Sequence, residues 1–271
     1  MAIPRALYGA ELRHRREAAG LSMSELSERL FCSSSLVCKF ESGHRRPLLD
    51  MAEQIDLVLG TDGCFARMCK EMQAASGYAD YFAEAAELEP DAETICEYAP
   101  IFLPGLLQTE AYTRAMVRAA QPTVTDAVVE DLVAARGHRI ARFEAAGKPE
   151  MFSVVDESVI RRRIGGPAAM RDQLHHLLDL MRRRRVFLQV LPLTAGAYGM
   201  PSMTKLLYLK EGPPVVYIEG QHSGQLSDDP SLVARYARSY DLVRSAALSP
   251  EASLSLIESV AKEYAKHAAK P

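Results

Sequence analysis

The stretch LSMSELSERLFCSSSLVCKFESG, from Leu21 to Gly43, decides the fold of the N-terminal part of the chain. Ser22 offers a helix N-cap and Glu25 follows three residues later, which is the pattern of a capping box. Ser33 is placed to cap a second helix, and Gly43 is suited to end it. The stretch therefore predicts two short helices joined by a tight turn.

Further helices are predicted on both sides of this stretch. Residues 7–19 have helical periodicity and are followed by Gly20, the residue best suited to a left-handed C-cap. Residues 48–59 form the next predicted helix, which stops at Gly60, and residues 65–75 form another. We therefore expect an all-α N-terminal helix-turn-helix domain over residues 1–75.

The remainder of the chain mixes short β-rich runs with helical patterns. Strands are predicted at 94–98, 152–155, 186–191, 205–209 and 215–218, where Gly and Pro bound most of the runs. Helices are predicted at 81–86, 111–119, 126–143, 170–184, 231–248 and 250–266, with Thr109 and Ser249 as N-caps. Strands flanked by helices predict an α+β domain over residues 76–271.

The second helix of the opening stretch carries a polar face that suits DNA. Val37 and Phe40 would bury its inner face, and a helix-turn-helix lays the opposite face in the major groove. Short hydroxyl side chains allow close approach to base edges, and Lys39 can reach a guanine or a phosphate. Arg45 and Arg46, just past the helix, are expected to hold phosphates. The predicted DNA-binding residues are Ser22, Ser33, Ser34, Ser35, Cys38, Lys39, Ser42, Arg45 and Arg46.

An ordinary helical bundle with a solvated polar face is the alternative for this segment. Serine is not a good helix former, however, so a helix that opens with three serines makes more sense as a docking surface. Whether Cys38 makes such a surface sensitive to oxidation stays open.

The N-terminal region resembles the Xre type of helix-turn-helix, which is related to phage repressors. The residues that carry the resemblance are LRxxRExxGLS (12–22), SELSERL (24–30) and SxxxVxKFESG (33–43). The resemblance implies that Arg16 pairs with Glu41 and ties the first helix to the recognition helix. The chain departs from the family at Met23, where a phosphate-binding glutamine is usual, and at Phe31, where the turn commonly has glycine.

The second half resembles the C-terminal domain of actinobacterial, antitoxin-like transcriptional regulators, the WhiJ-like family. The motifs are YxPxxxPGLLQT (98–109), DESVIRRRIGG (156–166), MRxQL (170–174), VxLQVLPxxAG (186–196), VVYIE (215–219) and ALSPExS (247–253). The resemblance implies a repressor-like protein, often encoded beside a small acidic partner protein. It transfers no ligand-binding residue to this chain.

Bulk properties narrow the classes of function. The formal net charge is -3, so DNA binding would depend on a local patch rather than on a global positive field. The five cysteines lack the close pairs typical of zinc sites, and we expect reduced thiols and no metal. No run approaches ~18 apolar residues and the N-terminus lacks an apolar signal region, so we expect a cytoplasmic protein.

No enzyme signature is evident in the sequence. It has no GxSxG, no HExxH and no glycine-rich phosphate loop. His175 and His176 are adjacent on a predicted helix, about 100° apart, so they cannot share one metal ion as i, i+4 histidines do. We therefore expect neither catalysis nor a cofactor.

Two hypotheses follow for the function. The first is a sequence-specific transcriptional regulator that binds double-stranded operator DNA. It would be a homodimeric repressor of its own or a neighbouring operon. A small partner protein or ligand would modulate it through the second domain. The second is an antitoxin-like interaction module whose main activity is binding a small acidic partner. The basic groups 161–163 and 182–185 are either solvated or a docking surface for such a partner or for flanking DNA phosphate. The operator sequence, the direction of regulation and the effector are not encoded in any readable motif.

Overall fold

The computed structural model describes residues 5–47, 49–74, 80–145, 149–196, 199–210, 212–220 and 223–268. The chain divides into two compact units, Met1–Glu84 and Ala85–Pro271. The boundary predicted from the sequence, after residue 75, falls at the edge of residues 75–79, which lie outside the described ranges. Each unit is considered below by itself.

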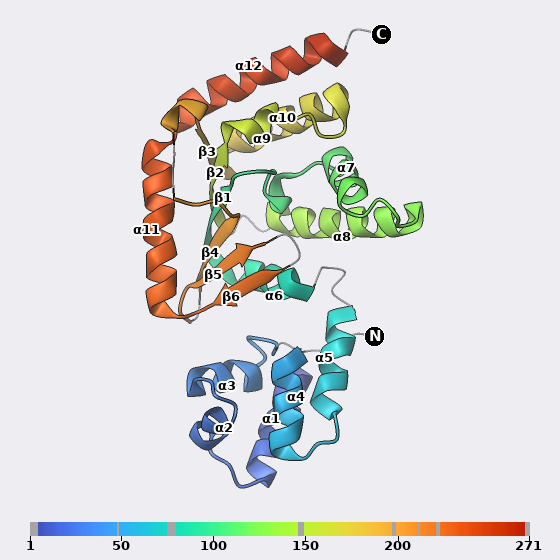
Figure 1. Ribbon diagram of the computed structural model, residues 1–271, viewed down its shortest axis with the longest axis vertical. Helices are drawn as coiled ribbons and strands as arrows, with labels where there is room; N and C mark the ends of the chain where they lie inside the picture. Colours follow the sequence, from blue (N-terminus) through green and yellow to red (C-terminus); the bar gives the residue numbers. More distant parts are fainter. Residues whose placement is uncertain are drawn as a thin grey trace. The chain divides into compact units, whose positions relative to one another are not determined.

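The first unit is all helical. Its helices are α1 (Arg5–Ala18), α2 (Met23–Arg29), α3 (Ser34–Glu41), α4 (Leu49–Leu59) and α5 (Cys64–Ala74) (Figure 1). Each helix buries side chains in one shared core, which includes Leu12, Leu26, Val37, Ile55 and Phe65. Full burial of such a side chain is worth about 1.5–3 kcal/mol, so this core holds the short helices that propensity alone would not.

Glycines end the helices where the sequence predicts. Gly20 has a φ of 69°, and its N–H donates to the carbonyl of Glu17 at 3.0 Å. The N–H of Leu21 donates to the carbonyl of Arg16 at 3.1 Å, which completes a Schellman motif. Gly60, with a φ of 63°, follows α4 in the same left-handed conformation. These predictions are confirmed.

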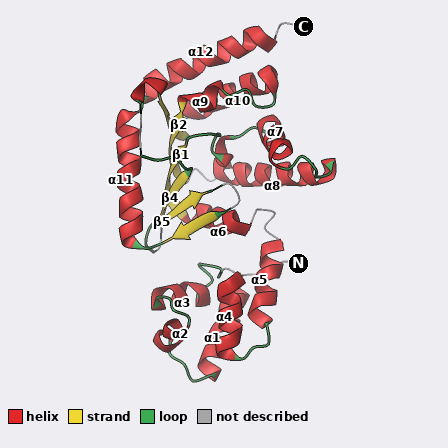
Figure 2. Ribbon diagram, viewed as in Figure 1, coloured by secondary structure: helices red, strands yellow, loops and turns green. Residues whose placement is uncertain are grey.

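The second unit is built on a six-stranded mixed sheet in the order β3-β2-β1-β4-β5-β6. Its strands are yellow in Figure 2. Strands β1, β2 and β3 are parallel, whereas β4 is antiparallel to β1 and the later strands alternate. The domain is therefore α+β, as predicted. Helix α6 (Asp80–Leu88) contains the unit boundary. The helices that follow it are η1 (Glu89–Asp91), η2 (Gly105–Leu107), α7 (Glu110–Ala120), α8 (Asp126–Ala145), α9 (Glu157–Arg161), α10 (Gly166–Arg182), η3 (Leu193–Ala195), α11 (Pro230–Ala246) and α12 (Pro250–Ala268). The strands are β1 (Ala92–Ala99), β2 (Glu150–Asp156), β3 (Val186–Leu191), β4 (Thr204–Leu209), β5 (Val215–Glu219) and β6 (Gly224–Ser227).

Helices cover both faces of this sheet. On one face, α7, α10 and α12 share a core with Ile95 of β1 and Leu207 of β4. On the other face, which α11 covers (Figure 1), Val233 and Tyr240 of α11 pack in a core that includes Tyr98 of β1. Because side chains alternate along a strand, neighbouring residues of β1 serve the two cores in turn.

The sequence located the five longer strands of this sheet but not strand β6 or helix α9. Strand β6 has four residues with no run of apolar side chains, and it lies at the edge of the sheet beside β5. Helix α9 has five residues, capped by Asp156, whose carboxylate accepts from the Ser158 N–H at 2.8 Å. Neither is long enough to show a period of its own.

Candidate nucleic-acid interface

Helix α2 begins with the predicted capping box. The Glu25 N–H donates to Ser22 Oγ at 3.2 Å, and the Ser22 N–H donates to Glu25 Oε2 at 2.8 Å. The hydrogen bond from the Ser22 backbone lowers the pKa of Glu25. Ser22 is exposed, but its hydroxyl is already engaged as the cap, so in this structure the residue mainly fixes the start of α2.

The turn between α2 and α3 is a second Schellman motif. The Phe31 N–H donates to the Glu28 carbonyl at 3.2 Å, and the Cys32 N–H donates to the Ser27 carbonyl at 3.0 Å. Phe31 takes the left-handed position, with a φ of 51°, and its side chain is 93% exposed. The turn therefore keeps the tight geometry although the residue there is not glycine.

Helix α3 is attached to α2 through serine side chains as well as through the core. Ser33 caps α3, its hydroxyl accepting from the Leu36 N–H at 3.2 Å. The hydroxyl of Ser34 lies 3.0 Å from that of Ser27, a buried residue of α2. Ser33 and Ser34 are exposed at the start of α3, yet each hydroxyl already has a partner inside the motif.

Helix α3 is also attached to α1 by a buried ion pair that the Xre resemblance implies. Arg16 Nη2 donates to Glu41 Oε2 at 3.0 Å, and Arg16 Nε donates to Glu41 Oε1 at 2.5 Å. Arg16 Nη1 donates to the Leu21 carbonyl at 2.7 Å. The two side chains are only 9% and 8% exposed, so this fork orients α3 firmly on α1. The pairing of Arg16 with Glu41 is confirmed.

The outer face of α3 is polar and open. Ser35 and Cys38 are exposed, and within the described residues neither side chain makes a hydrogen bond. Lys39, half-buried, and Ser42, exposed, continue the same face. Ser42 Oγ donates to the Lys39 carbonyl at 3.2 Å and lies 2.7 Å from His44 Nδ1. The structure thus brings Ser35, Cys38, Lys39 and Ser42 together on one surface.

Arg45 and Arg46, which follow α3, do not extend into solvent as the predicted phosphate contacts would require. Arg46 is only 2% exposed, with Nη1 3.6 Å from Cys69 Sγ, so its guanidinium is part of the protein interior. Arg45 forms an ion pair with Glu84, the last residue of the first unit, and its side chain is 13% exposed. Both had been expected to hold phosphates at the surface. An arginine after an exposed helix looks identical in sequence whether it turns outward or inward.

Other exposed side chains of the motif were not among the predicted contacts. Met23 starts α2 and is 40% exposed, and Arg29 is exposed at the end of that helix. His44 is exposed next to Ser42. Adjacency in sequence to Ser22 and Ser42 was the available signal for Met23 and His44.

Arginines of the group at 182–185 make contacts within the second unit. Arg182 Nη2 lies 2.5 Å from Glu258 Oε1, and Arg183 Nε lies 2.8 Å from Asp179 Oδ2. Arg185 donates to the Pro149 carbonyl at 2.8 Å, and its guanidinium lies 3.5 Å from the centre of the Phe143 ring. Arg182 and Arg183 stay 56% and 52% exposed, so a solvated group and a docking surface both stay predictions for residues 182–185.

Neither a metal site nor a membrane helix is found in the described part of the chain. No group of three or more His, Cys, Asp or Glu side chains there could hold a metal ion. None of the described helices is long and apolar enough to cross a membrane.

Two family models match the chain. One is described as a helix-turn-helix domain and matches residues 7–66, which include most of α1, all of α2 to α4 and the start of α5. The other is described as a domain of unknown function (DUF5753) and matches residues 82–259, most of the second unit. No curated protein and no solved structure matches the chain. The helix-turn-helix domain indicates a DNA-binding regulator. The Xre and WhiJ-like resemblances stay predictions.

Proposed function

Because the chain belongs to the DUF5753 family and carries an N-terminal helix-turn-helix domain, we propose that it is a sequence-specific transcriptional regulator that reads double-stranded DNA with α3. The observation that carries the proposal is the outer face of α3. That face carries Ser35, Cys38, Lys39 and Ser42. Ser35 and Cys38, whose side chains make no hydrogen bond within the described residues, can contact base edges directly.

The attachment of α3 supports this role as much as its exposed side chains do. The Arg16–Glu41 fork and the Ser27–Ser34 contact fix α3 on both neighbouring helices. A recognition helix that is held rigid loses little conformational entropy on binding, so more of its contact energy appears as affinity. Arg45 and Arg46 are left out of the proposed contact surface because of their burial and pairing.

The proposal extends to a homodimeric repressor of its own or a neighbouring operon. One recognition helix offers few base contacts, and two half-sites about one helical turn apart supply the rest. In this proposal the second unit carries the dimer contact and binds a small partner protein or a ligand that modulates DNA binding. The protein acts by binding rather than by catalysis.

The test is binding of the pure protein to its own upstream DNA and to a shuffled duplex of the same composition, measured by fluorescence anisotropy across ~50–200 mM salt. We expect the upstream DNA to bind at least about tenfold more tightly. Lys39→Ala should erase this preference while leaving a salt dependence, because Lys39 is proposed to read a base.

Lys70→Ala is the matched control, since Lys70 is an exposed lysine of the same unit that lies on α5 instead. It should retain the preference. Equal binding of the wild-type protein to both duplexes would contradict sequence-specific reading, and loss of preference in Lys70→Ala alone would move the reading surface away from α3.

A further inference from the structure

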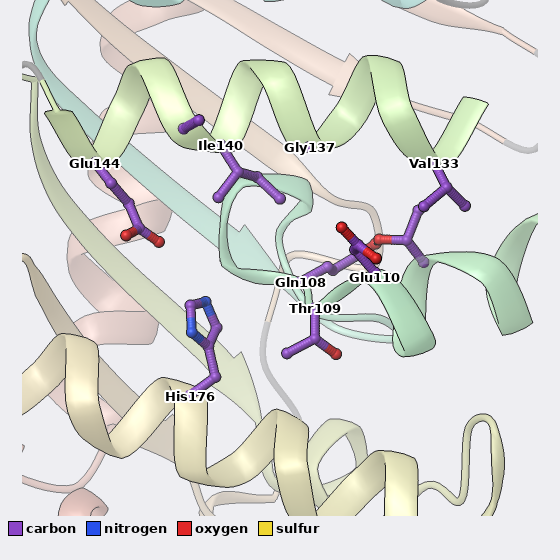
Figure 3. A pocket seen from close by; sticks show the side chains of 10 residues that line it. Gln108, Thr109, Glu110, Val133, Gly137, Ile140, Glu144 and His176 are labelled. Carbon is purple, nitrogen blue, oxygen red and sulfur yellow. The ribbon is translucent and has the colours of Figure 1, made fainter. Parts of the chain in front are cut away.

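A cavity of about 300 Å³ lies in the second unit between α7, α8 and α10 (Figure 3). Helix α8 supplies an apolar wall that includes Val133, Ile140 and Ala141. Thr109, Glu144 and His176 provide polar groups around it. Small-molecule sites in proteins begin at about this volume, so the cavity suits one small organic molecule and is too small for a folded partner.

His176 presents an unsatisfied polar atom at this cavity. Its Nε2 is buried and makes no hydrogen bond within the described residues. Figure 3 shows the ring rising from α10 toward the side chain of Glu144 on α8. Burial lowers the pKa of His176, so the ring is neutral near pH 7 and one of its nitrogens is a hydrogen-bond acceptor. A buried polar atom without a partner is unfavourable, and a ligand that hydrogen-bonds to it removes that cost.

The charges that line the cavity are negative. Glu110 and Glu144 both line it, and no lysine or arginine does so in the described part of the chain. Arg183 Nη2 lies 3.8 Å from Glu144 Oε2, beyond hydrogen-bonding distance, and Arg185 also interacts electrostatically with Glu144. Arg136 donates to Gln108 Oε1 at 2.7 Å and so contacts a residue of the wall rather than the cavity itself. Anionic ligands are therefore disfavoured.

We propose that this cavity binds a small organic amine. The protonated amine donates hydrogen bonds to the Glu144 carboxylate and to His176 Nε2, with the imidazole in the tautomer that carries its proton on Nδ1. The apolar body of the ligand lies on Val133, Ile140 and Ala141. An ammonium group fits this set because it has three donors and no acceptor, which complements a carboxylate and a neutral imidazole.

The test uses 2-phenylethylamine as the probe and phenylacetate as the matched anion, with the full-length protein. The imidazole resonances of the histidines are followed by NMR, and His176→Gln assigns the resonance of His176. We expect 2-phenylethylamine to shift that resonance saturably, while the resonance of His175, the exposed neighbour on α10, stays in place. Phenylacetate should produce no saturable shift.

Two variants separate the site from a general effect. Glu144→Gln should weaken amine binding by at least about tenfold, because it removes a charged acceptor. Ala141→Phe places a large side chain in the cavity wall while keeping Glu144 and His176, and should abolish binding. Absence of a saturable shift with the amine, equal binding of phenylacetate, or unchanged affinity in Ala141→Phe would each overturn the proposal. Because the readout does not involve DNA, the outcome of this test is independent of the function proposed above.

Discussion

At the scale of single residues, Phe31 has a left-handed backbone conformation that residues with a side chain rarely adopt. A left-handed backbone costs an L-residue roughly 1–2 kcal/mol relative to the right-handed helix region, and glycine avoids this cost. Phe31 adopts a φ of 51° while its ring stays 93% exposed, so packing does not offset the strain. The Schellman hydrogen bonds and the cores of α2 and α3 hold it there.

Phe31→Gly should therefore stabilise the first unit by about 1 kcal/mol, since it relieves the left-handed strain and removes little buried surface. Urea unfolding at pH 7, followed by circular dichroism, measures the change. Phe31→Ala is the control, because it removes the ring but keeps the strain, and should remain within about 0.5 kcal/mol of wild type. A clear loss of stability in both variants would mean that the ring has a packing role absent from this structure.

At the scale of elements, the crossing of α1 and α3 determines how the recognition helix is presented. Gly9 of α1 lies against the backbone of α3, where an added Cβ would come within 2.4 Å of the Glu41 carbonyl oxygen and 2.6 Å of that of Phe40. Real Cβ contacts are not that short, so only glycine permits this crossing. The Arg16–Glu41 fork locks the same pair of helices.

Gly9→Ala should force α3 away from α1 and destabilise the first unit by about 1–3 kcal/mol, the usual cost of overpacking. Thermal denaturation gives the change, and DNA affinity should fall with it. Gly137→Ala is the matched control, because an added Cβ in α8 meets nothing within 4 Å. That variant should be neutral or slightly stabilising. Equal stability of Gly9→Ala and wild type would contradict the close crossing.

Elements were predictable from the sequence where a local signal exists. Capping serines, helix-ending glycines and alternating β-rich runs located α2, α3 and the five longer strands, because those signals act over a few residues. The inward turn of Arg46 and the pairing of Arg45 with Glu84 depend on contacts distant in sequence, and no local pattern encodes them. The same holds for the cavity, whose wall joins α8 to His176 of α10.

At the scale of the whole molecule, the second unit contains a buried network of charges that links separate elements. Glu89 of η1 accepts from Arg139 of α8 at 2.6 and 2.8 Å and from Lys205 of β4 at 2.5 Å. Glu97 of β1 pairs directly with Lys205 in the β1–β4 register, with Nζ 3.3 Å from Oε2. All four side chains are buried, so the two carboxylates differ in their surroundings rather than in exposure.

Burial by itself would raise the pKa of Glu89, but Arg139 and Lys205 lower it to about 2. Burial raises the pKa of Glu97, against a weaker attraction to Lys205. The lowered pKa of Glu89 adds stability that is complete above its ordinary value of 4.5 and is lost as the pH falls toward 2. The raised pKa of Glu97 acts in the opposite sense, since its stabilisation is present at low pH and is lost as the pH rises.

Glu89→Gln should lower the free energy of unfolding by about 3–5 kcal/mol at pH 7, because it leaves two buried cations with one weakly held carboxylate. Glu97→Gln should cost less than about 1 kcal/mol, because Lys205 keeps Glu89 as a partner. Urea unfolding at pH 7 compares the two, and repeating it toward pH 3 should shrink the deficit of Glu89→Gln. Equal losses for both variants would contradict the assigned roles.

The most direct test of the central claim, that the outer face of α3 contacts DNA, is the alkylation rate of Cys38. Cys38 is exposed on that face, whereas Cys64 is half-buried at the start of α5 and serves as the internal reference. Peptide mass spectrometry follows both thiols with iodoacetamide. With the upstream duplex at about ten times its Kd, the account predicts about tenfold slower alkylation of Cys38 and an unchanged rate at Cys64. A shuffled duplex at that concentration should protect far less. Unchanged alkylation of Cys38 while the upstream duplex is bound would contradict the account.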